Sequence, residues 1–229
     1  MVPVLVLLPG LDGTGDLFAP LTAALGPDVH TIVVRYPDQP LDYASHEELA
    51  RSALPLGSPF ILLGESFSGP IAISIAASAP SALRGYVLCC SFLRSPRPLL
   101  PWVLPVSRLL PPRHVPAPVA DYFVMGRFGR PELRRLRAQA VRRVSSRTLQ
   151  ARLRAIASVD VSGALGRVRL PALYLRAAED RLVPRSAGEL FSKVASSAQV
   201  VDIEGPHFLL QAKPDLAAEA ICKFARQLA

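Results

Sequence analysis

The chain has 229 residues, enough for one domain with a buried core, and its composition excludes intrinsic disorder, because 50% of the residues are hydrophobic and only 19% are charged. No run of about 18 uncharged apolar residues occurs, so we expect no transmembrane segment. The net charge of +8 is unevenly placed, since residues 91–160 contain 14 arginines but only three acidic residues and therefore carry the whole excess.

Short apolar segments alternate with helical segments along the chain. The first, Val4–Leu8, is too short for a secretory signal and leads directly into a glycine-rich motif, so we expect a cytoplasmic protein. The alternation is typical of an α/β fold, in which helices cover both faces of a mostly parallel sheet. The expected strands are Val4–Leu8, Thr31–Arg35, Phe60–Gly64, Tyr86–Cys90, Ala172–Arg176 and Gln199–Ile203. The expected helices are Leu17–Leu25, Ser45–Leu54, Phe67–Ala79, Ser186–Val194 and Asp215–Leu228.

A glycine-rich segment, Pro9–Gly15, follows the first strand. It has neither the lysine of a Walker motif nor the spacing of a dinucleotide-binding loop. We interpret it as one half of an oxyanion hole, in which Gly10 permits a tight turn and the backbone N–H of Leu11 points into the site. Asp12 either braces this loop or touches the substrate, and the sequence leaves both roles open.

The third strand runs into the motif Gly64-Glu65-Ser66-Phe67-Ser68-Gly69, which is followed by a helix rich in small residues. A serine at the tip of a sharp strand-to-helix turn sits in a strained conformation, and small neighbours let the two backbones approach. The start of the helix presents the Phe67 N–H toward developing negative charge. Ser68 stands where glycine is usual, and serine is small enough for the turn. We therefore predict that Ser66 is a catalytic nucleophile.

A long connection follows the fourth strand. It runs through a proline-rich stretch, Ser95–Pro118, and an arginine-rich helical stretch, Pro131–Ser158. Connections of this length are usually functional. We expect a mostly helical cap or lid at residues 93–160, with the core of the domain formed by residues 1–92 and 161–229.

The composition of this cap bears on the substrate. Its apolar stretch Leu99–Leu110, with Trp102, could line an acyl pocket, although ordinary packing within the cap explains it equally well. The arginines could meet an anionic carrier, such as acyl carrier protein or coenzyme A, or an anionic membrane surface. A solvated basic face is an equal alternative. We expect no nucleic acid as a partner, because no reader motif accompanies the charge.

A serine hydroxyl needs a base to become a good nucleophile. Of the four histidines, His207 alone lies just beyond a strand and before a helix, at the sheet edge where α/β proteins place their ligand crevice. His30, His46 and His114 are read as surface or hydrogen-bonded histidines.

A carboxylate is expected to orient this imidazole. Asp180 follows the fifth strand directly and is the preferred candidate. Its neighbour Glu179 is an alternative, and Asp160 is a further one. With Ser66 and His207, Asp180 completes the chain order Ser, Asp, His.

Together these segments resemble the α/β-hydrolase superfamily over nearly the whole chain. Pro9–Gly15 and Gly64–Gly69 look like segments of small bacterial hydrolases and are similar, more distantly, to the acyltransferase part of plant phytyl ester synthases. Many family members carry His-Gly where this chain has Pro9-Gly10. The chain begins at the strand that is third in the family, so we expect a six-stranded sheet rather than one of eight strands.

The resemblance also implies roles for individual residues. Ser66, Asp180 and His207 match the family's catalytic triad, and the backbone N–H groups of Leu11 and Phe67 match its oxyanion hole. The implied enzyme is a serine hydrolase that cleaves carboxylic esters or thioesters through an acyl-enzyme. An acyltransferase would use the same triad, and a ligand receptor without turnover is a further alternative.

The implied mechanism needs no metal and no organic cofactor. Cys89, Cys90 and Cys222 have neither the pairing of a disulfide framework nor the spacing of a zinc site. We expect these cysteines to behave as small buried hydrophobic residues.

Overall fold

A computed structural model describes residues 3–96, 115–195 and 198–228 of the chain. Within these residues, six strands form one sheet in the order β2-β1-β3-β4-β5-β6, and each neighbouring pair is parallel. The predicted six-stranded α/β sheet is confirmed. The strands are β1 (Val4–Leu8), β2 (Thr31–Val33), β3 (Phe60–Glu65), β4 (Leu83–Cys89), β5 (Ala172–Ala177) and β6 (Ala198–Ile203).

Helices follow or precede nearly every strand. The α-helices are α1 (Ala19–Leu25), α2 (Tyr43–Ser52), α3 (Gly69–Ala77), α5 (Ala117–Val124), α6 (Pro131–Arg142), α7 (Ser146–Ser158), α8 (Ser162–Leu165), α9 (Arg185–Val194), α10 (Leu209–Ala212) and α11 (Pro214–Arg226). Short 3-10 turns are η1 (Asp16–Phe18), η2 (Ser66–Ser68) and η5 (Gly126–Phe128). No helix in the described ranges has the length and apolar character needed to cross a membrane.

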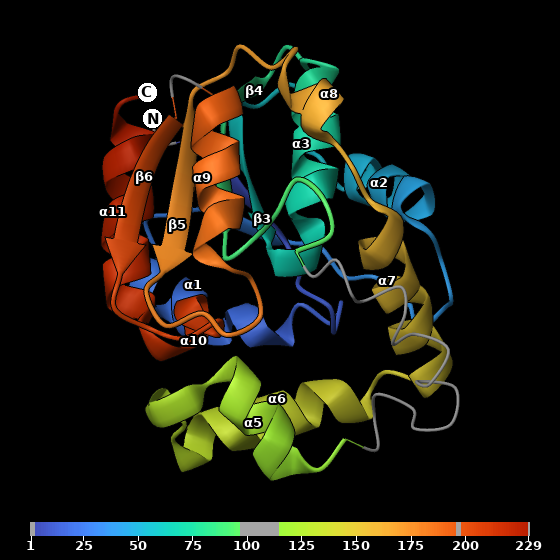
Figure 1. Cartoon of the computed structure of the whole chain (residues 1–229). Coiled ribbons are helices and arrows are strands. Elements are labelled where there is room, and N and C mark those ends of the chain that lie inside the picture. The colour runs from blue at the N-terminus through green and yellow to red at the C-terminus, as the bar shows by residue number, and fades with distance from the viewer. Residues whose placement is uncertain (1–2, 97–114, 196–197, 229) are drawn as a thin grey trace.

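The sheet is covered on both faces because side chains alternate along each strand. In β1, Val6 and Leu8 join the apolar core of one face, whereas Leu5 and Leu7 join the core of the other. The first core is completed by α2, α3, α8 and α9, and the second by α1, α10 and α11, an arrangement that can be followed in Figure 1. This burial on both faces explains why the strands read as continuous Val, Leu and Ile.

The boundaries differ from the predicted ones by a few residues, with local causes. β2 is shorter because the chain turns after it, and the Tyr36 N–H donates to the Gly13 carbonyl at 2.8 Å instead of continuing the sheet. β4 begins earlier, at Leu83, and ends before Cys90, whose φ of 48° lies in the left-handed region. The helix predicted from Phe67 starts as the 3-10 turn η2.

The insertion after the fourth strand is helical where it is described, as expected. Figure 1 shows α5 and α6 lying together beyond the ends of β5 and β6, apart from the sheet. Met125 and Leu133 from this segment pack with Leu17 and Phe208 in a small third apolar cluster. The helices therefore rest on the loops that follow β1 and β6, at the carboxyl edge of the sheet.

Candidate active site

A sharp turn between β3 and α3 carries Ser66 at this edge. The φ of Ser66 is 45°, in the left-handed region that residues other than glycine rarely adopt. A Cβ on Gly64 would lie 2.6 Å from the Ser68 carbonyl oxygen, so the strand and helix backbones approach as closely as glycine allows. The strained turn that the sequence motif predicts is therefore present.

Ser91, just after β4, holds this turn from the neighbouring strand. Its hydroxyl donates to the Ser66 carbonyl at 2.6 Å, and the Gly69 N–H donates to the same oxygen. A Cβ on Gly69 would lie 1.8 Å from the Ser91 Oγ, so glycine leaves the space for this bond. In a trans peptide the N–H points opposite to the carbonyl, and these bonds thus direct the Phe67 N–H away from Ser91.

Ser66, Asp180 and His207 come from three loops and form one chain of hydrogen bonds. The His207 Nε2 lies 3.0 Å from the Ser66 Oγ, and its Nδ1 lies 2.8 Å from the Asp180 Oδ2. Because an ionised carboxylate only accepts, Nδ1 carries the proton and Nε2 is left to accept from the serine hydroxyl. The N–H groups of Leu182 and Val183 each donate to the Asp180 Oδ1 at 2.8 Å and fix the carboxylate.

The pKa values of this pair shift in opposite directions. Burial alone would lower the pKa of His207, but the charge and hydrogen bond of Asp180, with the charge of Glu65, outweigh burial and raise it. Burial would raise the pKa of Asp180, but His207 and the two backbone N–H groups lower it. The carboxylate thus stays charged, and the imidazole becomes a stronger proton acceptor.

The alternative carboxylates are engaged elsewhere. Glu179 lies 2.6 Å from the Arg127 guanidinium in an exposed ion pair. Asp160 accepts from the Ser162 N–H at 2.9 Å. Of the three carboxylates considered, Asp180 is the one that contacts the imidazole.

The two other histidines that the structure describes are not among the residues that form the hydrogen-bonded chain. His30 is exposed, and His46 is fully buried, with its Nδ1 2.6 Å from the Asp42 carbonyl. Trp102, with the apolar stretch Leu99–Leu110, lies outside the described residues, as does His114.

The loop after β1 closes on itself. The Gly13 N–H donates to the Gly10 carbonyl at 3.1 Å, which fixes the peptide whose N–H belongs to Leu11. By the same trans-peptide geometry, the Leu11 N–H points away from Gly13. Neither this N–H nor that of Phe67 donates to another described residue. Both amides remain available to a ligand oxygen.

Asp12 braces this loop from inside. It is 7% exposed, and its Oδ2 accepts from both the N–H and the hydroxyl of Thr14, at 2.9 and 2.5 Å. These contacts support the role of Asp12 as a brace of the loop, in preference to a role in contacting the substrate.

Ser68 joins the turn of Ser66 to the loop after β1. Its side chain is fully buried and donates to the Pro9 carbonyl, while the Tyr36 hydroxyl lies 3.0 Å from its Oγ. A glycine here would leave the carbonyl and the hydroxyl without this partner. The departure from the usual glycine thus has a structural reason.

Comparison with known proteins places this geometry in context. The model of the alpha/beta hydrolase family matches residues 5–220. The chain belongs to the alpha/beta hydrolase family. It is 29% identical to the pimeloyl-[acyl-carrier protein] methyl ester esterase of Xanthomonas oryzae pv. oryzae, over 97% of this chain and 94% of that protein. It is 35% identical to phytyl ester synthase 1, chloroplastic, of Arabidopsis thaliana over 54% of this chain, a match that spans only 19% of the synthase.

Solved structures show the same fold at lower identity. A thermophilic esterase from Thermogutta terrifontis superposes with a TM-score of 0.85 at 18% identity, covering 100% of this chain and 90% of that one. The enol-lactonase from Burkholderia xenovorans LB400 gives 0.83 at 16% identity, covering 99% and 92%. With the family match and the esterase relatives, the protein is a hydrolase of the alpha/beta fold.

This hydrolase also buries the carboxyl group of Glu65, directly before Ser66. Glu65 is 5% exposed, and its Oε1 accepts from the Gln211 Nε2 at 2.9 Å. Burial raises the pKa of Glu65 to about 7, with the Gln211 bond acting against this shift and the charge of Asp12 adding to it. Sequence reasoning did not single out Glu65, because the motif specifies no residue type at its position.

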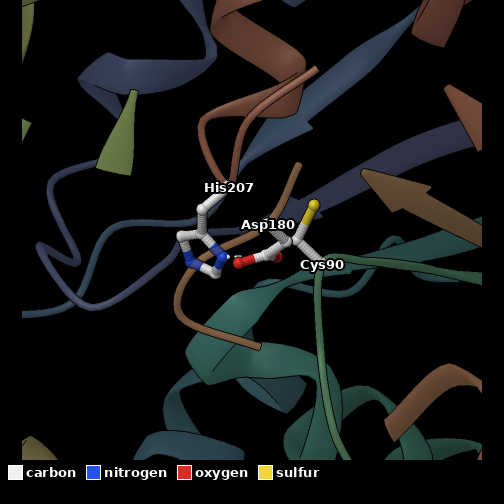
Figure 2. A group of neighbouring side chains, drawn as sticks. All are labelled: Cys90, Asp180 and His207. Atoms are coloured by element: carbon white, nitrogen blue, oxygen red, sulfur yellow. Dashed lines mark hydrogen bonds and ion pairs between the residues drawn. The ribbon is translucent and has the colours of Figure 1, made fainter. Parts of the chain in front are cut away.

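Cys90 lies beside Asp180 and His207 in the candidate site, as Figure 2 shows, with one potential ligand atom of each within 4.8 Å of the others. Burial raises the pKa of the Cys90 thiol well above its usual range, so the thiol stays protonated. Asp180 and His207 already bond to each other, and a metal would have to break that pair. Cys89 is buried as well, and Cys222 is half-buried, with all three thiols free.

One arginine of the basic segment has a different place from the rest. Arg152 of α7 is fully buried, and its Nη1 donates to the carbonyls of Leu11 and Asp12 at 2.9 and 2.7 Å. In the sequence, Arg152 is one of the 14 arginines that make up the charge excess of residues 91–160. Its spacing from the buried Leu149 and Ile156 puts it on the apolar stripe of α7, and that stripe is the signal that identifies it.

Proposed function

We propose that the protein is a serine hydrolase that cleaves carboxylic esters or thioesters through an acyl-enzyme on Ser66. The observation that carries the proposal is the hydrogen-bonded chain from the Ser66 hydroxyl through His207 to Asp180, at 3.0 and 2.8 Å. A serine hydroxyl reacts slowly unless a base takes its proton. The lowered pKa of Asp180 and the raised pKa of His207 support a charged carboxylate that strengthens that base.

The reaction proceeds in two halves. As the Ser66 Oγ attacks the carbonyl carbon, the His207 Nε2 accepts the hydroxyl proton, and Asp180 stabilises the resulting imidazolium. His207 then returns the proton to the departing alkoxide or thiolate, which leaves Ser66 acylated. In the second half His207 deprotonates a water molecule, the water attacks the acyl-enzyme, and the acid is released with Ser66 regenerated.

The N–H groups of Leu11 and Phe67 are proposed to hold the oxyanion of both tetrahedral intermediates. This role is supported by the bonds that orient the two peptides, from Gly13 to Gly10 and from Ser91 to Ser66. Losing one such donor typically raises the barrier by about 3 kcal/mol, or roughly 10²–10³-fold in rate.

An acyl group on an anionic carrier, such as acyl carrier protein or coenzyme A, is the proposed substrate class. One relative, at 29% identity, is named as an esterase of an acyl-carrier-protein ester. The helix α6 has several exposed arginines, among them Arg134, Arg135 and Arg142. Cations on the helices that cover the carboxyl edge suit a negatively charged carrier. In this proposal residues 93–160 act as the cap that selects the substrate.

Acyl transfer is a second candidate because of the similarity to phytyl ester synthase 1. It shares the acyl-enzyme and differs only in the group that resolves it, an alcohol in place of water.

A fluorophosphonate probe and a series of p-nitrophenyl esters of rising chain length, alongside acyl-thioesters, test the proposal. We expect the probe to label wild-type protein on Ser66, and Ser66→Ala to lose labelling together with at least 10³-fold of the hydrolysis rate. Ser158→Ala, at an exposed serine, serves as the matched control and should keep both. Near wild-type turnover by Ser66→Ala would exclude the proposed nucleophile.

The same assays separate the alternatives. Salt-sensitive preference for thioesters of a carrier over p-nitrophenyl esters supports the anionic carrier, and equal rates at all salt concentrations oppose it. New esters formed when alcohols are added indicate acyl transfer. A folded wild-type protein that binds acyl compounds but resists the probe indicates a receptor without turnover.

A further inference from the structure

The Arg152 side chain extends from α7 into the interior of the domain and donates four hydrogen bonds there. Besides the carbonyls of Leu11 and Asp12, its Nη2 donates to the Pro37 carbonyl at 3.1 Å, and its Nε donates to the His46 Nε2 at 3.3 Å. All four acceptors are neutral groups. The side chain is fully buried.

Arg152 has no direct ion pair among the residues that the structure describes, and a buried cation of this kind is a costly way to stabilise a fold. Burial lowers the pKa of Arg152, and the charges of Asp12 and Asp38 act in the opposite direction through space. Apolar side chains of similar size often stabilise a protein interior as well as buried charges do. A guanidinium at this buried position is therefore better explained by the hydrogen bonds that its N–H groups donate than by its contribution to stability.

The fit between Arg152 and the loop supplies such a role. A Cβ on Gly13 would lie 2.5 Å from the Arg152 Nη1, so the guanidinium occupies the concave side of the turn. There it donates to the carbonyls of Leu11 and Asp12, which follow the Leu11 N–H in the chain. The Gly13 N–H donates to the Gly10 carbonyl, which precedes the Leu11 N–H. The peptides on both sides of Leu11 are thereby fixed, one by Arg152 and one by Gly13.

His46 extends the contact toward the second amide. Its Nδ1 lies 2.6 Å from the Asp42 carbonyl, which only accepts, so Nδ1 carries the proton and Nε2 accepts from Arg152. Burial, assisted by the charge of Arg152, lowers the pKa of His46 and keeps the ring neutral. The ring packs edge-on against Phe67 at 5.1 Å between centroids.

We infer that Arg152, seated against His46, is a positioning residue that holds the Leu11 N–H in the orientation needed to bind the oxyanion. The inference rests on the proposed function, since it concerns the loop that would stabilise the tetrahedral intermediate. It also makes α7, a helix of the insertion, part of the support of the site.

The test compares Arg152→Met and Arg152→Lys with Leu149→Ala, a buried position on the same helix. For Arg152→Met we expect kcat to fall by up to about 10²-fold with KM within about threefold, because a misplaced donor is felt mainly in the transition state. Affinity for a trifluoromethyl ketone, which forms a tetrahedral oxyanion adduct with a nucleophilic serine, should fall by the same factor. Arg152→Lys, a cation with a different donor geometry, should lie between wild type and Arg152→Met. If Arg152→Met does not fold, Arg152→Lys takes its place in the kinetic and binding measurements.

Hydrogen exchange at residues 11–14 provides a readout independent of turnover. Exchange there should quicken in Arg152→Met and stay at the wild-type rate in Leu149→Ala, although both variants lose stability. Wild-type kcat and wild-type exchange in a folded Arg152 variant would overturn the inference, as would losses that match those of Leu149→Ala. Failure of the proposed function would give a different result. The fluorophosphonate would then not label the wild-type protein, while hydrogen exchange at residues 11–14 would still be faster in the Arg152 variants.

Discussion

The Ser68 hydroxyl donates a hydrogen bond to the Pro9 carbonyl, and this bond joins the turn that carries the proposed nucleophile to the loop after β1. The two backbone amides proposed to bind the oxyanion, those of Leu11 and Phe67, lie on the two segments that this bond connects. Their separation is thus set by a buried contact instead of by the loops alone.

Replacement of Ser68 by alanine removes that contact. We expect Ser68→Ala to lower the free energy of unfolding by about 1–3 kcal/mol, because the Pro9 carbonyl and the Tyr36 hydroxyl lose a buried partner. Urea unfolding measures the change. Ser58→Ala, at an exposed serine, should stay within about 0.5 kcal/mol of wild type. Equal midpoints for the two variants would show that the bond contributes nothing.

Replacement of Asp180 by asparagine should alter the rate and its pH dependence together. His207 must be neutral to accept the proton, so activity is lost as the pH falls through its raised pKa. Without the Asp180 charge that pKa falls, and the acid limb of kcat/KM moves to lower pH. The rate should drop by roughly 10⁴-fold.

The neighbouring carboxylate provides the control for this profile. Glu179 pairs with Arg127 at the surface, and Glu179→Gln should keep the wild-type profile. If Glu179→Gln moved the acid limb while Asp180→Asn did not, the assignment of the orienting carboxylate would be reversed.

Replacement of Glu65 by glutamine should change how stability depends on pH. The folded protein retains a proton on Glu65 up to a pKa of about 7, whereas the unfolded chain loses it near 4.5. The stability associated with Glu65 is therefore full below pH 4.5 and is lost as the pH rises through 7, by about 3 kcal/mol in total. Glu65→Gln has no such loss, so its stability relative to wild type should rise between pH 4.5 and pH 8.

Urea unfolding at several pH values checks this difference. Glu132→Gln, at an exposed residue of α6, is the matched variant and should follow the wild-type curve. A constant difference between Glu65→Gln and wild type from pH 4.5 to pH 8 would contradict a buried carboxyl with a raised pKa.

Addition of a methyl group at Gly64 should disturb the turn of Ser66. In Gly64→Ala the new Cβ would lie 2.6 Å from the Ser68 carbonyl oxygen and 2.9 Å from the Gly69 Cα, both backbone atoms that cannot move aside easily. We expect a loss of about 1–3 kcal/mol of stability and a fall in esterase rate. Gly163→Ala, where the new Cβ meets nothing within 4 Å, should be neutral or stabilising. Full activity of Gly64→Ala would mean that the backbones can separate freely.

Much of the fold could be predicted from the sequence because buried parallel strands are short, apolar and regularly spaced. The three residues proposed for the triad were also accessible, since each follows a strand and the carboxyl ends of parallel strands share one edge. His207 and Asp180 needed no knowledge of distances, only of where strands end.

The remaining contacts depend on packing between segments far apart in the chain. Ser91 is one of many serines, and only the close approach of β4 to the Ser66 turn makes its hydroxyl a partner of the Ser66 carbonyl. The helical spacing puts Arg152 on the apolar stripe of α7, but only the packing of α7 against the loop after β1 shows which carbonyls it binds. Gln211 and Glu65 are 146 residues apart in the sequence, so no local sequence pattern predicts the hydrogen bond between them.

The burial of Arg152 also limits how the insertion between β4 and β5 can be engineered. A designer who replaces the whole insertion with the corresponding segment of another hydrolase would remove the guanidinium that fills the turn around Gly13. The carbonyls of Leu11, Asp12 and Pro37 would then need replacement donors from the graft. Exchange of this insertion is thus a redesign of the core, and a transplant that spares α7 is the more promising starting point.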